Sequence, residues 1–371
     1  MEEIFFENLQ TFVLVLLYGG LVLQSFIVLV NPMNVNKRAN FFFGLFLFFW
    51  SSFWLLNVLK FCGLPPNELF TFLIQSLQIF TPVSLFFSVV FFINPDYGFK
   101  KNDLVCLIIP VIYWILLFNG QHNPASYSAA MLIDVSHNLP YIVIIYFKIR
   151  HYQKRIKSIS SSTENINLQW LIKLTVLLFV TIVITVWYEF YNAFVYKRHQ
   201  HLLMDILYLL IVYISAYYSL RQKEIYPADK KQRAELLSVE TENEAQADKK
   251  KLIADDDFEN LKQHLKNLME TQKPFLDGEL NLLKLADLMQ LNVHQLSYLL
   301  NNGFGENFFQ FVNKYRVAQA KKLLQDDSKT NLSMLGIAFE SGFNSKTTFN
   351  TIFKKMTNLT PSEFKKKHST L

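Results

Sequence analysis

Small polar side chains cluster on a short segment near the C-terminal end of the 371-residue chain. Phe349, Ile352 and Phe353 are spaced three and four apart, so in a helix they share one buried face. The remaining positions carry short polar groups and lysines: Lys346, Thr347, Asn350, Thr351, Lys354 and Lys355. Short donors and acceptors on a helix can hydrogen-bond base edges in the DNA major groove, and lysines suit phosphates. We therefore expect these six residues to contact DNA.

A similar but less charged set lies earlier, in Asn281–Tyr298. An apolar stripe that begins at Leu282 predicts a first helix. Asn292 and Gln295 predict a capping pair at the start of a second helix. The polar residues of this second helix are expected to face outward, toward DNA: His294, Gln295, Ser297 and Tyr298.

Each polar set thus falls on the second helix of an expected helix-turn-helix unit. In the later unit, Ser333 caps the first helix, and Gly342 ends it where a positive φ costs little. Between the two units, Phe308–Leu324 is expected to form one long helix. Thr360–Glu363 predicts a capping box with Pro361 at the first helical position. The C-terminal part is therefore predicted to be an all-α domain with two helix-turn-helix units.

These motifs, in this order, resemble the AraC/XylS family of bacterial regulators over about Leu280–Lys367. The resemblance rests on Leu285-Ala286, Tyr315-Arg316, Ala318, Ala320, Leu323-Leu324, Ile337-Ala338-Phe339-Glu340-Ser341-Gly342-Phe343, Phe349, Phe353-Lys354-Lys355 and Thr360-Pro361-Ser362-Glu363-Phe364. In this family a linker helix holds two recognition helices, which enter adjacent major grooves roughly 34 Å apart on one DNA face. The resemblance therefore implies sequence-specific DNA binding through the polar sets named above.

The first recognition helix departs from the family pattern because it has no Arg or Lys. Tyr298 and Asn301 stand where basic residues are usual, so we expect the second unit to carry most of the specificity. Arg316 is expected to form an ion pair within the domain rather than to read a base. Phe258–Leu371 holds fourteen Lys and one Arg against ten acids, a net charge of +5. Affinity should then depend on phosphate contacts and fall with salt.

The first 220 residues are apolar and contain most of the 36 Phe residues. Seven stretches approach or exceed the roughly 20 residues that cross a bilayer. They are about Thr11–Val30, Asn40–Val58, Leu69–Ile93, Leu104–Phe118, Met131–Phe147, Leu171–Phe194 and Leu202–Leu220. The fourth is short, and the fifth contains Asp134, His137 and Pro140, so an even number of spans is the alternative. The expected fold is a seven-helix transmembrane bundle followed by the cytoplasmic helical domain.

Loop charge gives the expected orientation. With the N-terminus outside, the inside loops hold fourteen basic residues and the outside loops three. This asymmetry agrees with the positive-inside rule, and a DNA-binding domain must also face the cytoplasm. We expect a multi-pass protein of the bacterial inner membrane. If one of the seven spans fails to cross, this orientation no longer holds.

Three acids lie inside or next to the expected spans: Asp134, Glu189 and Asp205. Ionisable groups at such positions are costly and point to function. The orientation places all three toward the outer half of the bundle, with His137 one helical turn from Asp134. We interpret the four residues as an outward-facing pocket for a small or cationic ligand. The alternative is a position at the aqueous interface; no spacing demands a metal, and no metal site is predicted.

The expected domains are 1–220 for the membrane module, 221–257 for a linker and 258–371 for the DNA-binding domain. The linker is rich in mixed charge, which favours a flexible or partly helical segment. Phe258–Glu270 carries an apolar stripe and is expected to pack as a helix on the DNA-binding domain.

The combined prediction is a membrane-bound transcription regulator that couples a signal at the membrane or outer face to transcription. Its expected partners are double-stranded DNA, the lipid bilayer and a small-molecule ligand, with a homodimer as one assembly. The alternative is a transporter or channel with a regulatory helix-turn-helix tail; passive anchoring is a further reading. The sequence lacks a phosphate-binding Gly-rich loop, a metalloprotease His pair and a serine-nucleophile elbow. We therefore expect neither an enzyme nor a cofactor.

Overall fold

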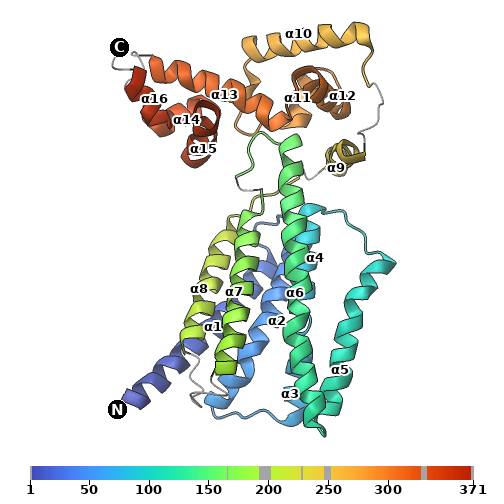
Figure 1. The fold of residues 1–371 in the computed structure, drawn as a ribbon, viewed down its shortest axis with the longest axis vertical. Helices are drawn as coiled ribbons and strands as arrows, with labels where there is room; N and C mark the ends of the chain where they lie inside the picture. The colour runs from blue at the N-terminus through green and yellow to red at the C-terminus, as the bar shows by residue number, and fades with distance from the viewer. Residues whose placement is uncertain are drawn as a thin grey trace. The chain divides into compact units, whose positions relative to one another are not determined.

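Two units make up the fold, and each combines two separate stretches of the chain. The computed structural model describes residues 2–164, 166–191, 202–226, 229–245, 252–326 and 332–368. The first unit comprises Met1–Arg150 with Leu168–Ile225, and the second comprises His151–Asn167 with Tyr226–Leu371. Throughout the described residues the regular elements are helices, so the all-α prediction is confirmed (Figure 1).

The first unit contains eight α-helices in its described part. They are α1 (Glu2–Val30), α2 (Lys37–Phe61), α3 (Glu68–Gln78), α4 (Thr81–Ile93), α5 (Ile108–Gly120), α6 (Pro124–Arg155, whose last turn belongs to the second unit), α7 (Gln169–Tyr191) and α8 (Leu202–Leu220). Seven stretches among the described residues are long and apolar enough to cross a membrane. They are Asn8–Val30, Lys37–Phe61, Glu68–Ile93, Lys101–Gly120, Pro124–Ser158, Gln169–Tyr188 and Leu202–Leu220.

Three of these stretches differ in detail from the sequence prediction. The third is interrupted, because α3 ends at Gln78 and α4 restarts at Thr81 with a proline in its first turn. The short fourth stretch is lengthened by a 3-10 helix, Lys101–Leu107, that leads into α5. The fifth passes Pro140 without a break and runs as α6 to Arg155.

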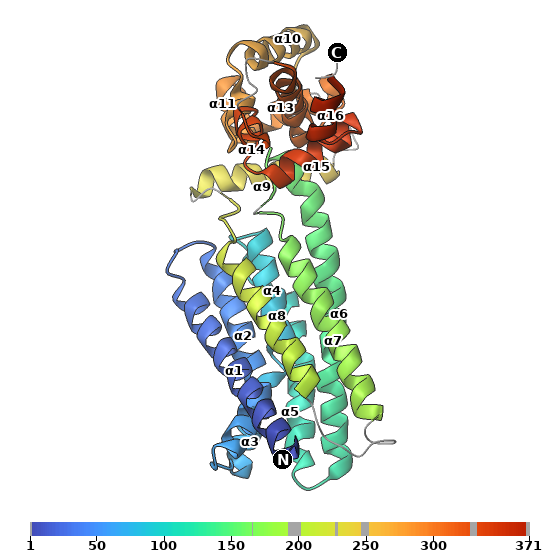
Figure 2. The same ribbon diagram turned by 90° about the vertical axis from the view of Figure 1, so that its left-hand side faces the viewer.

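Helices α1, α2 and α8 pack together in the first unit, and α4 packs on α2 (Figure 2). Small residues allow a close approach: Ser25 donates a hydrogen bond to the carbonyl of Gly44, and a Cβ at Gly44 would lie 2.6 Å from Leu29. Such contacts are typical of helix pairs in lipid. Large apolar side chains point outward, including Phe12 and Phe26, which are 61% and 64% exposed. This outward-facing apolar surface is what a bilayer solvates.

The second unit carries eight further α-helices that the structure describes. They are α9 (Lys230–Ala245), α10 (Asp255–Thr271), α11 (Leu282–Leu288), α12 (Val293–Tyr298), α13 (Phe308–Gln325), α14 (Met334–Glu340), α15 (Lys346–Thr357) and α16 (Pro361–His368). The predicted linker helix between the two helix-turn-helix units is α13. The helix predicted before the first helix-turn-helix unit is α10. Part of the expected linker is therefore the regular helix α9; residues 246–251 lie outside the described part.

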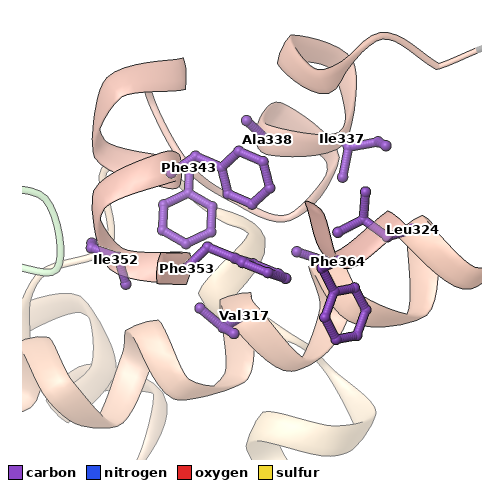
Figure 3. Close-up of a cluster of buried hydrophobic side chains, with 10 residues drawn as sticks. Val317, Leu324, Ile337, Ala338, Phe343, Ile352, Phe353 and Phe364 are labelled. Carbon is purple, nitrogen blue, oxygen red and sulfur yellow. The ribbon is translucent and has the colours of Figure 1, made fainter. Parts of the chain in front are cut away.

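The core of the second helix-turn-helix unit joins α13, α14, α15 and α16. Three phenylalanines fill its centre, namely Phe343, Phe349 and Phe353, each at most 2% exposed. Figure 3 shows Phe343 and Phe353 in this cluster. The ring centroids of Phe343 and Phe349 lie 5.3 Å apart at a tilted angle, and those of Phe349 and Phe353 lie 5.5 Å apart edge to face. These distances are within the range that aromatic pairs prefer. Val317 and Leu324 of α13 close the core from the other side. This packing fixes α15 by one face and leaves its other face outside the core.

Candidate nucleic-acid interface

Local capping sets the ends of the second helix-turn-helix unit as the sequence predicts. The Ser333 hydroxyl accepts the Gly336 N–H at 3.0 Å, and the Ser345 hydroxyl accepts the Thr348 N–H at 3.1 Å. Gly342 has φ +83°, and a Cβ there would lie 2.2 Å from the carbonyl oxygen of Phe275. The turn between α14 and α15 therefore requires glycine both for its backbone angle and for its space.

Helix α15 presents the residues that the sequence assigns to DNA. Phe349, Ile352 and Phe353 are buried, as predicted from their spacing. The opposite positions are exposed, except for the half-buried Asn350: Lys346, Thr347, Thr351, Lys354 and Lys355. The Thr351 hydroxyl donates to the carbonyl of Thr347 within the helix at 2.9 Å. The face therefore combines polar groups with lysines, as reading a groove between two phosphate backbones requires.

Helix α12 differs, because its capping pair involves one of the predicted readers. Gln295 accepts the Asn292 N–H at 3.1 Å, while Asn292 accepts the Gln295 N–H at 2.8 Å. The predicted capping box is confirmed, but it engages the Gln295 side chain. The prediction that Ser297 faces outward is wrong, since this residue is 6% exposed. Val293, Leu296, Ser297 and Leu300 follow the three-and-four spacing of a buried stripe, which the sequence already contained.

The other two predicted readers of α12 contact segments outside the helix-turn-helix. Nε2 of His294 lies 3.1 Å from the hydroxyl of Ser238 in α9, which packs on α12. The Tyr298 ring meets Phe258 of α10 edge-on, with centroids 6.0 Å apart. The first recognition helix is therefore engaged by the chain that follows the last membrane-length helix. Mixed charge had predicted a flexible or partly helical linker here, and α9 is a helical part of it. Its contact with α12 was not predicted from the sequence.

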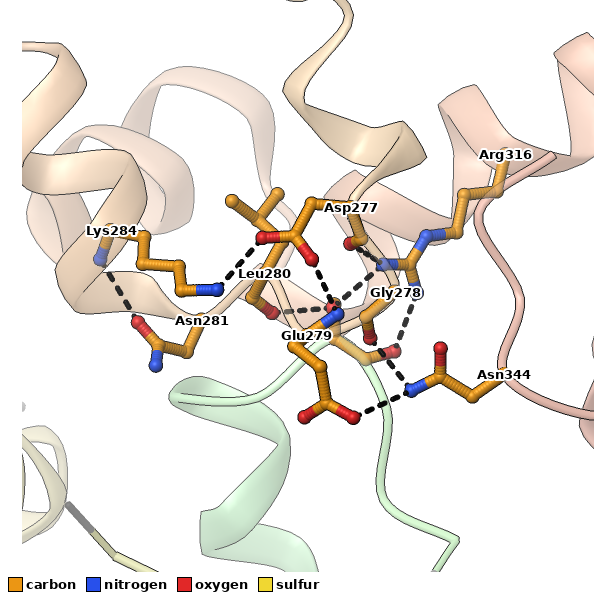
Figure 4. Close-up of polar contacts among 9 residues, drawn as sticks. Asp277, Gly278, Glu279, Leu280, Asn281, Lys284, Arg316 and Asn344 are labelled. Carbon is orange, nitrogen blue, oxygen red and sulfur yellow. Dashed lines mark hydrogen bonds and ion pairs between the residues drawn. The ribbon is translucent and has the colours of Figure 1, made fainter. Parts of the chain in front are cut away.

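Arg316 of α13 is buried inside the second compact unit and is 1% exposed. It donates to the carbonyl of Phe275 at 2.8 Å. It also donates to the carbonyl of Asp277 at 2.8 Å (Figure 4). Its guanidinium also stands over the Phe343 ring, 5.9 Å from the centroid. Burial lowers its pKa to about 10, against the nearby Asp277 and Glu279 charges, so it stays cationic at neutral pH. The prediction that Arg316 forms an ion pair is wrong, because its guanidinium bonds main-chain oxygens rather than a carboxylate. Its bonds do lie within the domain, as predicted.

The remaining bonds of Arg316 go to a segment far away in the sequence. His151–Asn167, hereafter the docking segment, connects α6 to α7 and belongs to the second unit. Its Ser161 is fully buried and accepts from Arg316 through its carbonyl at 3.2 Å and its hydroxyl at 3.0 Å. Asn313 of α13 donates to the same carbonyl at 3.0 Å. No sequence pattern pointed to this contact, which joins positions 155 residues apart.

The docking segment also pairs with the start of the first helix-turn-helix unit. Ser160 forms an isolated antiparallel bridge with Asn281, and the Leu282 N–H donates to the Ile159 carbonyl at 2.9 Å. Ile159 is 3% exposed, and Lys157 lies 5.9 Å from the centroid of the Phe309 ring. The segment is thus held by main-chain pairing, apolar burial and the Arg316 bonds together.

One residue of the docking segment reaches the second recognition helix. The Thr348 hydroxyl in the first turn of α15 donates to Oε2 of Glu164 at 2.9 Å. Glu164 is exposed, so the contact is solvent-accessible. A carboxylate at this position brings negative charge to the helix end that, in helix-turn-helix proteins, approaches base edges.

A second cluster of polar residues, around Asp277, holds the loop before α11 in place (Figure 4). Burial would raise the pKa of Asp277, but Lys284 at 2.8 Å and the Glu279 N–H outweigh it and hold this pKa below its usual range. Asn344, in the turn before α15, donates to the Gly278 carbonyl at 2.9 Å. A Cβ at Gly278 would lie 1.8 Å from the Asn344 side-chain oxygen, so a side chain at this position would have to displace the Asn344 amide.

The predicted ligand pocket is partly assembled in the first unit. Asp134 of α6 and Asp205 of α8 line one cavity of about 450 Å3. His137 is not in its lining, but its ring meets the cavity residue Tyr141 edge-on at 5.0 Å between centroids. Glu189 belongs to α7, and its side chain lies outside what the structure describes. Two of the four predicted residues therefore share a cavity.

Comparison with known proteins supports the assignment of the C-terminal region. Residues 285–367 match a family model described as a helix-turn-helix domain. The chain is 37% identical over 82 residues to YesN of Bacillus subtilis (strain 168), whose printed name is that of an uncharacterized transcriptional regulatory protein. That alignment covers 22% of each chain, so this chain spans less than a quarter of that relative's length. No solved structure matches. The C-terminal region is thus similar to helix-turn-helix domains over residues 285–367, in agreement with the fold described above.

Proposed function

We propose that this protein is a membrane-bound, sequence-specific transcription regulator that couples a signal at the membrane to DNA binding. The seven apolar helices cross the bacterial inner membrane, with the N-terminus outside and the DNA-binding unit in the cytoplasm. Lys346, Thr347, Asn350 and Thr351 read bases, and Lys354 and Lys355 bind phosphates. The protein is not an enzyme.

The observation that supports coupling is that the second unit includes the docking segment, which lies between two membrane-length helices in the sequence. The docking segment continues α6 and leads into α7, both of which are membrane-length helices. It supplies Ser161 to the buried Arg316, which lies on the same helix, α13, that packs against α15. A change in the angle or depth of α6 and α7 therefore acts directly on a segment of the DNA-binding unit, with no need for the linker to transmit it.

The same contacts indicate the sign of the coupling. Glu164 of the docking segment bonds Thr348 of α15, and Ser238 of α9 contacts His294 of α12. Both recognition helices thus touch a segment that is covalently adjacent to a membrane helix. We infer that the docked arrangement restrains DNA binding, because a carboxylate beside the recognition helix repels phosphates. A signal that withdraws the docking segment then raises affinity, by shifting the population between two states.

The decisive experiment is genome-wide DNA occupancy of the tagged full chain in its own cells. Lys346→Ala with Asn350→Ala removes one cation and one amide from α15, whereas Lys266→Ala with Asn267→Ala removes the same two types from α10. Both pairs are accessible to solvent. Discrete sites that disappear only in the α15 double variant would support the proposal.

Two other outcomes would contradict it. Absence of discrete sites under every growth condition would favour the alternative of a transporter or channel with a regulatory tail. Equal loss in both double variants would show that charge alone, rather than α15, holds the protein on DNA. Membrane insertion and orientation are tested separately, by reporter fusions placed after each apolar helix.

A further inference from the structure

A second pocket of the first unit lies where two membrane-length stretches end. Its volume is about 380 Å3, and it is hereafter called the basic pocket. Lys37 and Arg38, at the start of α2, line one part of it, and Tyr97–Phe99, in the connection that follows α4, line another. The stretch that contains α2 begins at Lys37, and the stretch that contains α4 ends at Ile93. Since the ends of membrane-crossing helices reach the headgroup region, the proposed insertion brings the basic pocket to the level of the lipid headgroups.

The charged residues that line the basic pocket are cations. Lys37 and Arg38 are exposed, and neither forms an ion pair with a residue that the structure describes. Asp96 and Asp103 follow α4 but do not line the pocket, and Asp103 already accepts the Tyr97 hydroxyl at 2.9 Å. Cations in the first turn of a helix are also disfavoured by its dipole. An anion between the two side chains would offset both their mutual repulsion and this effect.

Arg38 is held in place and still has donors to offer. One guanidinium N–H donates to the Tyr97 carbonyl at 3.1 Å, and the guanidinium carbon lies 5.6 Å from the centroid of the Phe91 ring. An arginine carries five N–H donors, and the structure records this single hydrogen bond from Arg38 to a described residue. A guanidinium fixed in this way loses little freedom on binding, and its forked donors match the oxygens of a phosphate.

The rest of the basic pocket is aromatic and continues onto the outer surface of α2. Phe41 and Phe99, both in the lining, are 50% and 62% exposed. Phe41, Leu45 and Phe48 are spaced four and three apart, so they share one face of α2, and Phe48 is 46% exposed. A free phosphate ion gains nothing from this apolar face, whereas an acyl chain buries surface on it. Basic pockets between membrane helices are typical sites for anionic lipid headgroups.

We propose that the basic pocket binds an anionic phospholipid, with its phosphate between Lys37 and Arg38 and an acyl chain along Phe41 and Phe48. On the proposed orientation these cations lie on the cytoplasmic side, so the lipid belongs to the inner leaflet. The inference rests on the proposed function only for membrane insertion, because the binding step requires neither DNA nor a signal.

The test is native mass spectrometry of the full chain in a neutral detergent, titrated with dioctanoylphosphatidylglycerol. Dioctanoylphosphatidylcholine has the same acyl chains but no net charge, and should bind at least about fivefold more weakly. Lys37→Gln should weaken binding of the anionic lipid by about fivefold, the contribution of one basic residue near an anionic lipid. Lys37 bonds no described residue, so this variant leaves the recorded contacts of the fold intact. Lys60→Gln removes the same charge from an exposed position at the other end of α2, and should bind like the parent.

Arg38 provides a second comparison. Arg38→Gln should weaken binding of the anionic lipid by at least as much as Lys37→Gln, because it removes both a charge and the forked donors. Arg38→Lys keeps the charge and should lie between the parent and Arg38→Gln. Loss of the anionic lipid in Arg38→Gln together with parent-like binding in Lys37→Gln would contradict the shared phosphate site.

Three further results would overturn the proposal. Equal affinity for the two lipids would make the basic pocket a general apolar groove. Equal losses in Lys37→Gln and Lys60→Gln would reduce the effect to net charge. Inorganic phosphate that displaces the anionic lipid with equal affinity would assign the pocket to a soluble anion.

These outcomes are distinguishable from a failure of the proposed function. The reporter fusions test insertion and orientation without reference to lipid class. If the fusions report the expected orientation but Lys37→Gln binds the anionic lipid like the parent, the lipid site fails and the proposed function stands. Fusions that report no insertion would overturn the proposed function, whatever the lipid titration gives.

Discussion

The two recognition helices of the DNA-binding unit are built alike but are engaged differently. In α15 the core takes three apolar residues and leaves lysines and small polar groups exposed. In α12 one predicted reader is buried, one caps the helix and two contact α9 or α10. The unit thus has one reading surface that is largely available and one that is covered by the chain itself.

This difference teaches that a recognition motif and an available recognition surface are separate properties. Both helices carry the turn, the cap and the buried stripe that define the motif. What separates them is contact with elements outside the motif, namely α9 and α10 on α12 and a single residue, Glu164, on α15. On the proposed function, a signal that exposes a recognition helix would have more to gain at α12. We expect base reading in the present arrangement to depend on α15.

The largest effect should come from destroying the support of α15. Phe353 is fully buried, so Phe353→Ala should cost about 3–5 kcal/mol and abolish DNA occupancy. Met356→Ala, at a residue of the same helix that is 42% exposed, should leave the stability and the DNA occupancy nearly unchanged. Hydrogen exchange of the α15 amides and DNA occupancy measure the two effects. Retained protection of α15 in Phe353→Ala would contradict the packing described above.

The next effect concerns the buried arginine and its partner in the docking segment. Arg316→Lys keeps the charge but loses the forked donors, and should destabilise the second unit by about 2–3 kcal/mol. Ser161→Ala removes one acceptor and should cost about 1 kcal/mol. Ser162→Ala is the neighbouring control, at a half-buried residue. Hydrogen exchange of residues 159–161 gives the readout, and equal effects of Ser161→Ala and Ser162→Ala would show that the Arg316 bonds do not matter.

The effect of single substitutions on DNA affinity should distinguish α15 from α12 directly. Asn350→Ala should weaken binding to selected duplexes by about 10- to 100-fold, the cost of one lost base contact of about 1–3 kcal/mol. His294→Ala, which removes a polar side chain from the covered helix, should change the same affinity by less than about twofold, within the ±0.5 kcal/mol of a neutral substitution. Gel-shift titration of the full chain in nanodiscs provides the measurement. A larger effect at His294 would reverse the order of the two helices.

The smallest effect should reveal the restraint on α15. Glu164→Gln and Glu259→Gln each remove one negative charge from the second unit, but only Glu164 contacts a recognition helix. Glu164→Gln should raise DNA affinity by about two- to fivefold, because exposed ionic contacts contribute at most about 1 kcal/mol. Glu259→Gln, whose side chain faces Lys262 on α10, serves as the charge-matched control. Equal gains in the two variants would reduce the restraint to net charge.

Local features were predictable because the residues that form them are close together in the sequence. Ser333, Gly342 and the pair Asn292–Gln295 all form the caps and the turn expected of them. The inward position of Ser297 could have been found from its spacing with Val293 and Leu300, but its polarity was given more weight. Seven apolar helices followed from composition alone.

Contacts between distant parts of the chain were not predictable in this way. Ser161 meets Arg316 across 155 positions, and Trp54 meets Asp205 across 151. No local pattern encodes either pairing, since each depends on how whole helices pack. Asp134 and Asp205 of the predicted pocket share a cavity, while the aromatic wall beside Asp205 went unrecognised. That this cavity binds a ligand stays a prediction.

Proteolytic release, a common way to free a tethered domain, would have an unusual result here. A single cut after α8 would liberate α9 to α16 but leave the docking segment behind, because that segment lies between α6 and α7. The freed fragment would lack Ser161, so Arg316 would keep its bonds to Phe275 and Asp277 and give its other donors to water. The fragment would also lose Glu164 from the end of α15. A protease would thus produce a domain that differs in structure and charge from the tethered one, and not merely one that diffuses.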